Sequence, residues 1–144
     1  MLGRMLIQGL IATAALAALP FAAMAANAQR DGIIADYAAQ ARKAGPAFTG
    51  FSAQRGETLF RARWTGGDAR TPSCTSCHTD NPKTSGQNAK TGRSIDPIAV
   101  SADPSRFTDA AQVEKHFARD CKSVIGRDCT ATEKGDYATF MAGQ

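Results

Sequence analysis

The chain has 144 residues, of which 17 are Lys or Arg and 13 are Asp or Glu, so its formal net charge is +4 at pH 7. This length fits a single domain. The basic residues are scattered and form no run interleaved with aromatics, which argues against nucleic-acid binding, and a solvated basic surface is the simplest interpretation of the charge.

The first 25 residues have the pattern of a secretory signal peptide. A basic start with Arg4 precedes an apolar run over residues 10–19, and the stretch ends in the small-x-small pattern Ala23-Met24-Ala25. We expect cleavage after residue 25, or alternatively after residue 28, which leaves 26–144 as a mature periplasmic domain. The alternative is an uncleaved membrane anchor. The apolar run is short and Pro20 follows it, so we expect no stable membrane insertion after cleavage.

Helical spacing dominates the next part of the chain. Residues 31–44 predict a helix that Gly45 and Pro46 end. The residues sharing its apolar face are Ile33, Ile34, Tyr37, Ala38 and Ala41. Residues 53–63 predict a second helix with Ser52 as its N-cap. In that helix Gly56 and Phe60 share a face, where the glycine lets another helix backbone approach closely.

Residues 65–105 are rich in Gly, Pro, Ser, Thr and Asn and have no sustained period. A loop this long is unusual in a compact domain, so it indicates a function, and a bound prosthetic group could order it. Residues 108–120 predict a third helix. The residues expected along one of its stripes are Ala110, Val113, His116, Phe117 and Asp120.

A last helix is predicted from residue 130, where Thr130 and Glu133 fit a capping box. Its inner face is expected to carry Tyr137, Phe140 and Met141. The resulting fold class is all-α. The core is modest for this length, so a large apolar cofactor would help the chain to fold.

The sequence Cys74-Thr75-Ser76-Cys77-His78 has the attachment pattern of a c-type haem. Its two cysteines can each form a thioether to a haem vinyl group, and His78 then becomes the proximal iron ligand. A structural zinc site would need a better-spaced second ligand pair, and a thioredoxin-like redox pair would need an α/β pattern. A chance match in a disulfide-held domain is the third alternative. The pattern favours one covalent haem c.

Once Cys74 and Cys77 are assigned to haem, Cys121 and Cys129 remain to pair in an oxidising compartment. A disulfide there would stabilise the fold by roughly 2–3 kcal/mol on the chain-entropy model. The alternative is two free buried thiols.

The candidates for the distal iron ligand lie close to this pair. His116 and Asp120 are four residues apart and therefore neighbours on a helix. Histidine would give a low-spin iron, whereas aspartate suits ferric iron and holds ferrous iron weakly, so reduction could open a site for O2 or NO. One of the two could also ligate while the other orients it. Met141 is the only methionine beyond the signal peptide, and a core role is favoured for it. The alternative is that His116 is a partly exposed helix residue and that Asp120 caps nearby backbone.

Across residues 52–144 the chain resembles the small oxygen-binding c-type cytochromes called sphaeroides haem proteins, SHP. The segments that carry the likeness are "TPSCTSCH", "KTGRSIDP", "RFTDAAQVEKHF", "CKSVIGRDCT" and "EKGDYATF". The resemblance implies a class I cytochrome c fold whose N- and C-terminal helices cross, with Gly56 and Phe60 facing Tyr137 and Phe140. It also implies one haem on Cys74, Cys77 and His78 and a disulfide between Cys121 and Cys129.

In that family the distal ligand is an asparagine just before the first disulfide cysteine, and it leaves the iron on reduction so that O2 or NO can bind. This sequence has Asp120 at the matching position, and His116 stands where a characterised member carries an aromatic. Asp120 could ligate through a carboxylate oxygen, with a negative charge that favours Fe(III) and lowers the potential, or His116 could replace it. The family also implies a redox partner, with a dihaem cytochrome c as the candidate.

The sequence therefore predicts a periplasmic monohaem c-type cytochrome that transfers electrons and whose labile distal ligand allows O2 or NO binding. One alternative is a six-coordinate bis-histidine electron carrier. Another is a haem enzyme that turns over NO or peroxide, with His116 and Asp120 as its acid and base.

Overall fold

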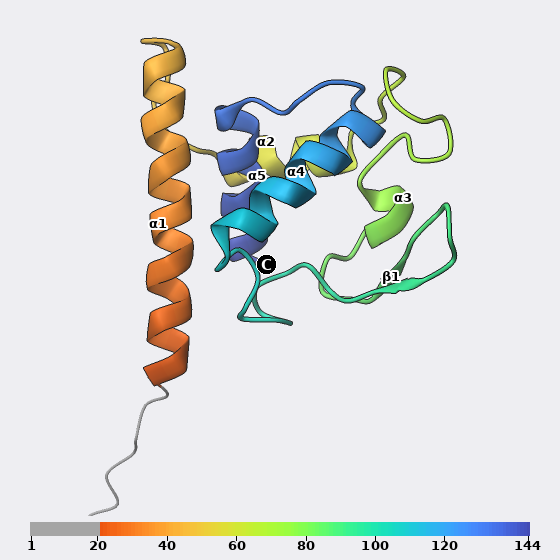
Figure 1. Cartoon of the computed structure of the whole chain (residues 1–144), viewed down its shortest axis with the longest axis horizontal. Coiled ribbons are helices and arrows are strands. Elements are labelled where there is room, and N and C mark those ends of the chain that lie inside the picture. Colours follow the sequence, from red (N-terminus) through yellow and green to blue (C-terminus); the bar gives the residue numbers. More distant parts are fainter. Residues whose placement is uncertain (1–20) are drawn as a thin grey trace, which may run out of the picture.

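The computed structural model describes residues 21–144, and its fold is mostly helical (Figure 1). The helices are α1 (Phe21–Ala44), α2 (Ala53–Arg61), α3 (Thr75–His78), α4 (Ala110–Val124) and α5 (Ala131–Ala142). Two short strands, β1 (Gly86–Gln87) and β2 (Ser94–Ile95), form one antiparallel pair. The prediction of an all-α fold is confirmed.

Most of the predicted signal peptide, residues 1–20, lies outside the described residues. The two predicted cleavage positions, after residues 25 and 28, fall within α1. No helix within residues 21–144 is long and apolar enough to cross a membrane.

Helix α1 contains ten more residues at its N-terminal end than the sequence predicted, because the alanine-rich segment before residue 31 also favours helix. Its end at Ala44 and its buried face of Ile33, Tyr37 and Ala41 are as predicted. The face also includes Arg30, which is only 4% exposed. Its guanidinium donates to the carbonyl oxygens of residues 104 and 106, which ties α1 to the loop before α4.

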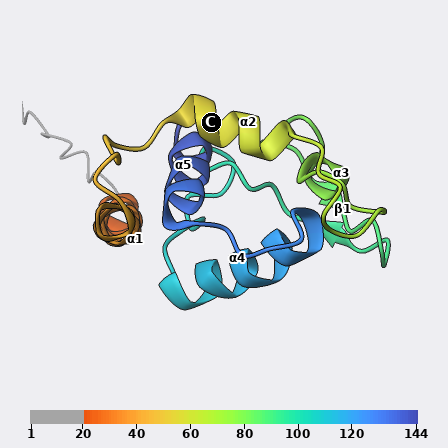
Figure 2. The same ribbon diagram turned by 90° about the horizontal axis from the view of Figure 1, so that it is seen from above.

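Helices α2 and α5 cross at close range, as predicted (Figure 2). A Cβ on Gly56 would overlap the carbonyl oxygen of Asp136 and lie 2.8 Å from the Cβ of Phe140, so only glycine lets the two backbones come this near. Phe60 is fully buried beside the crossing, with ring centroids 6.2 Å from Tyr137 and 5.9 Å from Phe140.

Polar contacts secure the same crossing. Asp136 is 4% exposed and accepts hydrogen bonds from the backbone N–H of Ser52 (2.7 Å) and from Nε of Arg55 (2.7 Å). The predicted N-cap is confirmed, since Ser52 Oγ also accepts from the backbone N–H of Arg55. A single carboxylate therefore connects the start of α2 to the middle of α5.

Helix α4 begins two residues later and ends four residues later than predicted. Of the residues predicted along one stripe, Val113 and Phe117 are buried and Asp120 is half-buried, whereas Ala110 and His116 are exposed. The buried stripe continues instead through Cys121 and Val124. Helical spacing predicts which residues share a face, but not how much of that face a neighbour covers.

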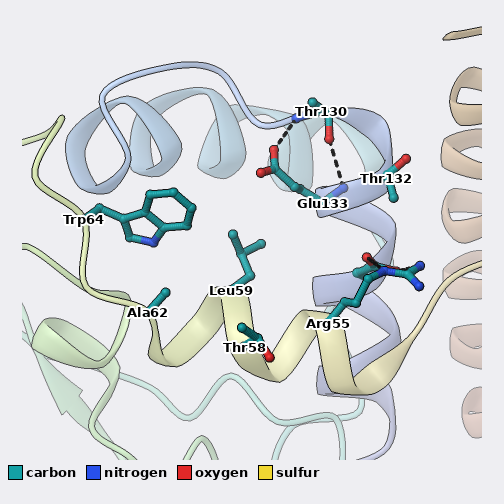
Figure 3. Close-up of a pocket in the computed structure, with 9 residues that line it drawn as sticks. Arg55, Thr58, Leu59, Ala62, Trp64, Thr130, Thr132 and Glu133 are labelled. Carbon is teal, nitrogen blue, oxygen red and sulfur yellow. Dashed lines mark hydrogen bonds and ion pairs between the residues drawn. The ribbon is translucent and has the colours of Figure 1, made fainter. Parts of the chain in front are cut away.

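Helix α5 begins with the predicted capping box. Thr130 Oγ1 accepts from the backbone N–H of Glu133 (3.2 Å), and Glu133 Oε2 accepts from the backbone N–H of Thr130 (2.8 Å), as Figure 3 shows. Met141 is fully buried in a cluster with Phe60, Ile98 and Phe140. This places Met141, the only methionine of residues 26–144, in the apolar core.

Candidate haem site

The predicted attachment motif lies on α3, a single helical turn that the sequence did not predict. Its geometry depends on Ser73, which is 2% exposed. The Ser73 hydroxyl donates to the carbonyl oxygen of Phe60 (3.1 Å) and accepts from the backbone N–H of Thr75 (3.3 Å). The start of the motif is thereby held against the end of α2, and the turn brings Cys74, Cys77 and His78 close together.

Both cysteines of the motif are free thiols and half-buried. Cys74 packs against two apolar clusters of the core. One is the cluster of Phe60, Ile98, Phe140 and Met141, and the other includes Phe117 and Val124. Burial, with a smaller effect from Asp120, raises the pKa of the Cys74 thiol to about 12. Cys77 lies nearer the hairpin, where a Cβ on Gly86 would overlap its carbonyl oxygen. The motif therefore packs against the apolar core at Cys74 and against β1 at the backbone of Cys77.

His78 is half-buried, and burial lowers the pKa of its imidazole. The charge of Asp120 opposes this shift, while Arg106, His116 and Arg119 add to it. The imidazole is therefore neutral at neutral pH, which is the form that binds a metal. These interactions also show that the fold brings the polar residues of α4 to the motif, although the two are far apart in sequence.

A haem-ligating histidine usually donates its second ring N–H to a carbonyl or carboxylate group, and the carbonyl of Pro97, in the loop after β2, is one candidate acceptor. In the structure this carbonyl accepts a hydrogen bond from Nε of Arg106 (2.8 Å). A carbonyl oxygen has two lone pairs, so one remains for a second donor.

The two candidate distal residues lie on one face of α4, and a third side chain joins them. Arg119 donates from Nε and Nη2 to the two carboxylate oxygens of Asp120, at 2.6 and 2.9 Å. Arg119 Nη2 is also 2.9 Å from Nδ1 of His116, whereas that nitrogen is 3.7 Å from Asp120 Oδ2. Arg119 was not among the site residues that the sequence predicted, and its only signal was its position next to Asp120.

Cys121 and Cys129 form a disulfide with a Cα–Cα distance of 5.7 Å. The end of α4 beside it is held by other contacts. The backbone N–H of Asp68 donates to the carbonyl oxygen of Ser123 (2.7 Å), and Lys90 Nζ donates to Ser123 Oγ (2.9 Å). Asp120 is therefore adjacent to a segment that a disulfide, the loop after α2 and the hairpin all restrain.

Comparison with known proteins identifies relatives of this chain. Residues 46–141 match a family model described as a domain of unknown function, DUF1924. The cytochrome c-type protein SHP of Cereibacter sphaeroides is 52% identical over 92 residues, which cover 64% of this chain and 70% of SHP. The structure of oxidised SHP, described as an oxygen-binding cytochrome c, superposes with a TM-score of 0.73 at 46% identity, covering 80% of this chain and 96% of that one.

The chain belongs to the family of c-type cytochromes that includes SHP. Cytochrome c'' of Methylophilus methylotrophus is a further relative, 31% identical over 115 residues, which cover 80% of this chain and 78% of that protein. Its oxidised crystal structure has a TM-score of 0.70 at 30% identity, covering 81% of this chain and 95% of that one. The resemblance to SHP inferred from the sequence is confirmed.

The residues of this cytochrome fit a haem. The ring of Tyr137 lies among three phenylalanines, with ring centroids 6.2 Å from Phe60, 6.2 Å from Phe107 and 5.6 Å from Phe117. Cys74 and Tyr137 both pack against the two apolar clusters. Burial raises the pKa of the Tyr137 phenol well above its usual range, as expected for an apolar environment. Two free thiols and a neutral imidazole beside an aromatic wall are the donors and surroundings that haem c needs.

A pocket elsewhere in the structure contains none of the predicted haem residues (Figure 3). It lies between α2 and the start of α5. Its lining residues are Arg55, Thr58, Leu59, Ala62, Trp64, Thr130, Thr132, Glu133 and Asp136. The zinc alternative finds no support, because within residues 21–144 no three His, Cys, Asp or Glu side chains converge on a point.

Proposed function

We propose that this chain is an exported, periplasmic monohaem cytochrome c that transfers electrons and binds O2 or NO in its reduced state. The observation that carries the proposal is the position of Asp120. Its charge acts on both Cys74 and His78, so a carboxylate lies close to the attachment motif.

Cys74 and Cys77 would hold one haem through thioethers, and His78 would be its proximal ligand. When bound, the haem would supply a one-electron redox centre and an iron with a second position for a ligand. The protein supplies the neutral imidazole, the apolar surroundings and the choice of group at that second position.

Asp120 is the favoured distal group, and His116 is the alternative. A carboxylate oxygen suits ferric iron and holds ferrous iron weakly, so the Asp120 carboxylate would leave when the protein is reduced. The descriptions of the relatives support this proposal. SHP is described as oxygen-binding, and the solution structure of cytochrome c'', at 30% identity and a TM-score of 0.68, is described in terms of haem-ligand detachment.

A redox partner is the remaining part of the proposal, with a dihaem cytochrome c as the candidate donor. Residues 81–95, next to the attachment motif, contain Lys83, Lys90 and Arg93 and no acidic residue. This segment would fit an acidic surface on the partner and would favour rapid association at low salt.

The contact of Arg119 with both His116 and Asp120 also supports a second candidate function, turnover of NO or peroxide. An enzyme of this kind needs positioned acid–base groups, and these side chains could provide them. Steady consumption of NO or peroxide by the reduced protein would favour this function. Stoichiometric binding without turnover would favour the carrier.

The test is a set of absorption and EPR spectra of the purified haem protein, oxidised and reduced, for wild type, Asp120→Ala and His116→Ala. We expect the reduced wild type to be high-spin and to shift on addition of CO or NO. Asp120→Ala should change the ferric spectrum, and His116→Ala should leave it unchanged. A reduced protein that stays low-spin, and loses this character only in His116→Ala, would instead identify a bis-histidine carrier.

A further inference from the structure

The side chain of Arg119 contacts both candidate distal ligands at once, but the contact has a different effect on the ability of each to bind iron. An arginine guanidinium has only donor N–H groups. The 2.9 Å contact between Arg119 Nη2 and His116 Nδ1 therefore makes Nδ1 the acceptor, with its lone pair directed at the arginine. The 3.7 Å separation between His116 Nδ1 and Asp120 Oδ2 is too long for a competing hydrogen bond.

This contact determines the tautomer of His116. When Nδ1 is an acceptor, the proton of the neutral ring is on Nε2, so Nε2 has no lone pair to offer a metal. Ligation through Nε2 would move that proton to Nδ1, where it would face an N–H of Arg119. As long as the contact with Arg119 persists, neither nitrogen of His116 is available to iron.

Asp120 can still bind iron while it accepts hydrogen bonds from Arg119. Each of its oxygens accepts one hydrogen bond from Arg119, at 2.6 and 2.9 Å. A carboxylate has about four lone-pair sites, so each oxygen retains one. The positive charge of Arg119 also draws electron density from the carboxylate, which weakens it as a donor.

We propose that Arg119 is a positioning residue that selects Asp120 over His116 as the distal ligand. This inference rests on the proposed function and deepens it, because the selected ligand is the one that leaves on reduction.

The experiment compares the haem-loaded wild type with Arg119→Met, which keeps the length of the side chain and removes its donors. The matched control is Lys122→Met, because Lys122 is on the same helix, has the same 62% side-chain exposure and pairs with Asp128 instead. The double variant Arg119→Met/His116→Ala shows whether any new ligand is His116. The readouts are the ferric EPR spectrum and the rate of CO binding to the reduced protein.

We expect a low-spin bis-histidine EPR signal in Arg119→Met that is absent in the double variant and in Lys122→Met. CO binding to reduced Arg119→Met should be slower by about two- to fivefold, the range that loss of an exposed ion pair allows. The double variant should recover the wild-type rate. A low-spin signal that persists in the double variant, or an equal one in Lys122→Met, would overturn the proposal.

The inference and the proposed function can fail separately. A wild type that binds CO when reduced, with no spectral change in Arg119→Met, would refute only the role of Arg119. A reduced wild type that is low-spin and unaffected by His116→Ala would refute the labile ligand, while the EPR spectrum of Arg119→Met would still decide whether Arg119 excludes His116. A bis-histidine wild type would refute both.

Discussion

The substitution Gly56→Ala tests the helix crossing that shapes the haem site. A Cβ at position 56 would overlap the carbonyl oxygen of Asp136 and stand 2.6 Å from its carbonyl carbon and 2.8 Å from the Cβ of Phe140. These atoms belong to the α5 backbone or are attached directly to it, so no side-chain rotation can relieve the contact. To restore an ordinary separation of about 3.5 Å, α5 must retreat by roughly 1 Å.

Two opposing effects determine the size of the change. Alanine is better than glycine inside a helix by about 1 kcal/mol, whereas overpacking of this kind costs about 1–3 kcal/mol. A shift of α5 would also strain the hydrogen bonds that Asp136 accepts from Ser52 and Arg55. We expect a net loss of about 1–2 kcal/mol in the free energy of unfolding, and a Tm lower by about 4–8 °C.

The matched control is Gly32→Ala, in the interior of α1, where nothing lies within 4 Å of the added Cβ. Helix propensity alone should then stabilise the protein by about 0.5–1 kcal/mol. Thermal and guanidinium unfolding of the ferric haem protein, followed by far-UV circular dichroism, would measure both variants. A rise in stability for Gly56→Ala similar to that of the control would refute the close approach of α2 and α5.

Three further substitutions test other parts of the structure. Thr130→Ala removes half of the capping box of α5 and should cost about 1 kcal/mol in urea unfolding, whereas an unchanged midpoint would show that the box does not stabilise the helix. Ser73→Ala leaves the buried contact to Phe60 unmade and should cost about 1–3 kcal/mol; exposed Ser94→Ala is its control, and equal effects would contradict the anchoring of α3. Hydrogen bonds from Arg70, and then from Lys90, hold the pKa of Asp68 well below its usual range. Because the folded-state pKa is the lower one, this contribution is present above about pH 4 and is lost as pH falls further. Asp68→Asn should therefore flatten the acid decline of stability, and an unaltered pH profile would show that this carboxylate does not contribute.

Local patterns in the sequence predicted several features correctly. The cap at Ser52, the capping box at Thr130 and the end of α1 before Gly45 each depend on residues within one helical turn. The α2–α5 crossing was inferred from the resemblance to SHP together with the spacing of Gly56 and Phe60. Such features can be predicted because the interacting groups are close in sequence, or because the family resemblance supplies the long-range contact.

Other features were missed because their partners are distant in sequence. Arg30 would be expected at the surface from its charge, yet carbonyl groups more than seventy residues away satisfy its guanidinium. The single turn of α3 is too short to show a period, and it depends on the contact of Ser73 with Phe60. Ala110 was predicted on the same stripe of α4 as Val113 and Phe117, yet it is exposed whereas they are buried.

By itself the sequence determined the chemistry that this protein can carry. The spacing of Cys74, Cys77 and His78 within one turn predicts haem attachment, because this pattern requires only neighbouring residues. The tertiary structure decided which groups face that motif. It placed the polar face of α4 near His78, because this arrangement depends on the packing of segments that are far apart in sequence, which residue spacing does not encode. The contacts of Arg119 with His116 and Asp120 lie within one helical turn, and they depend on side-chain positions that the structure alone supplies.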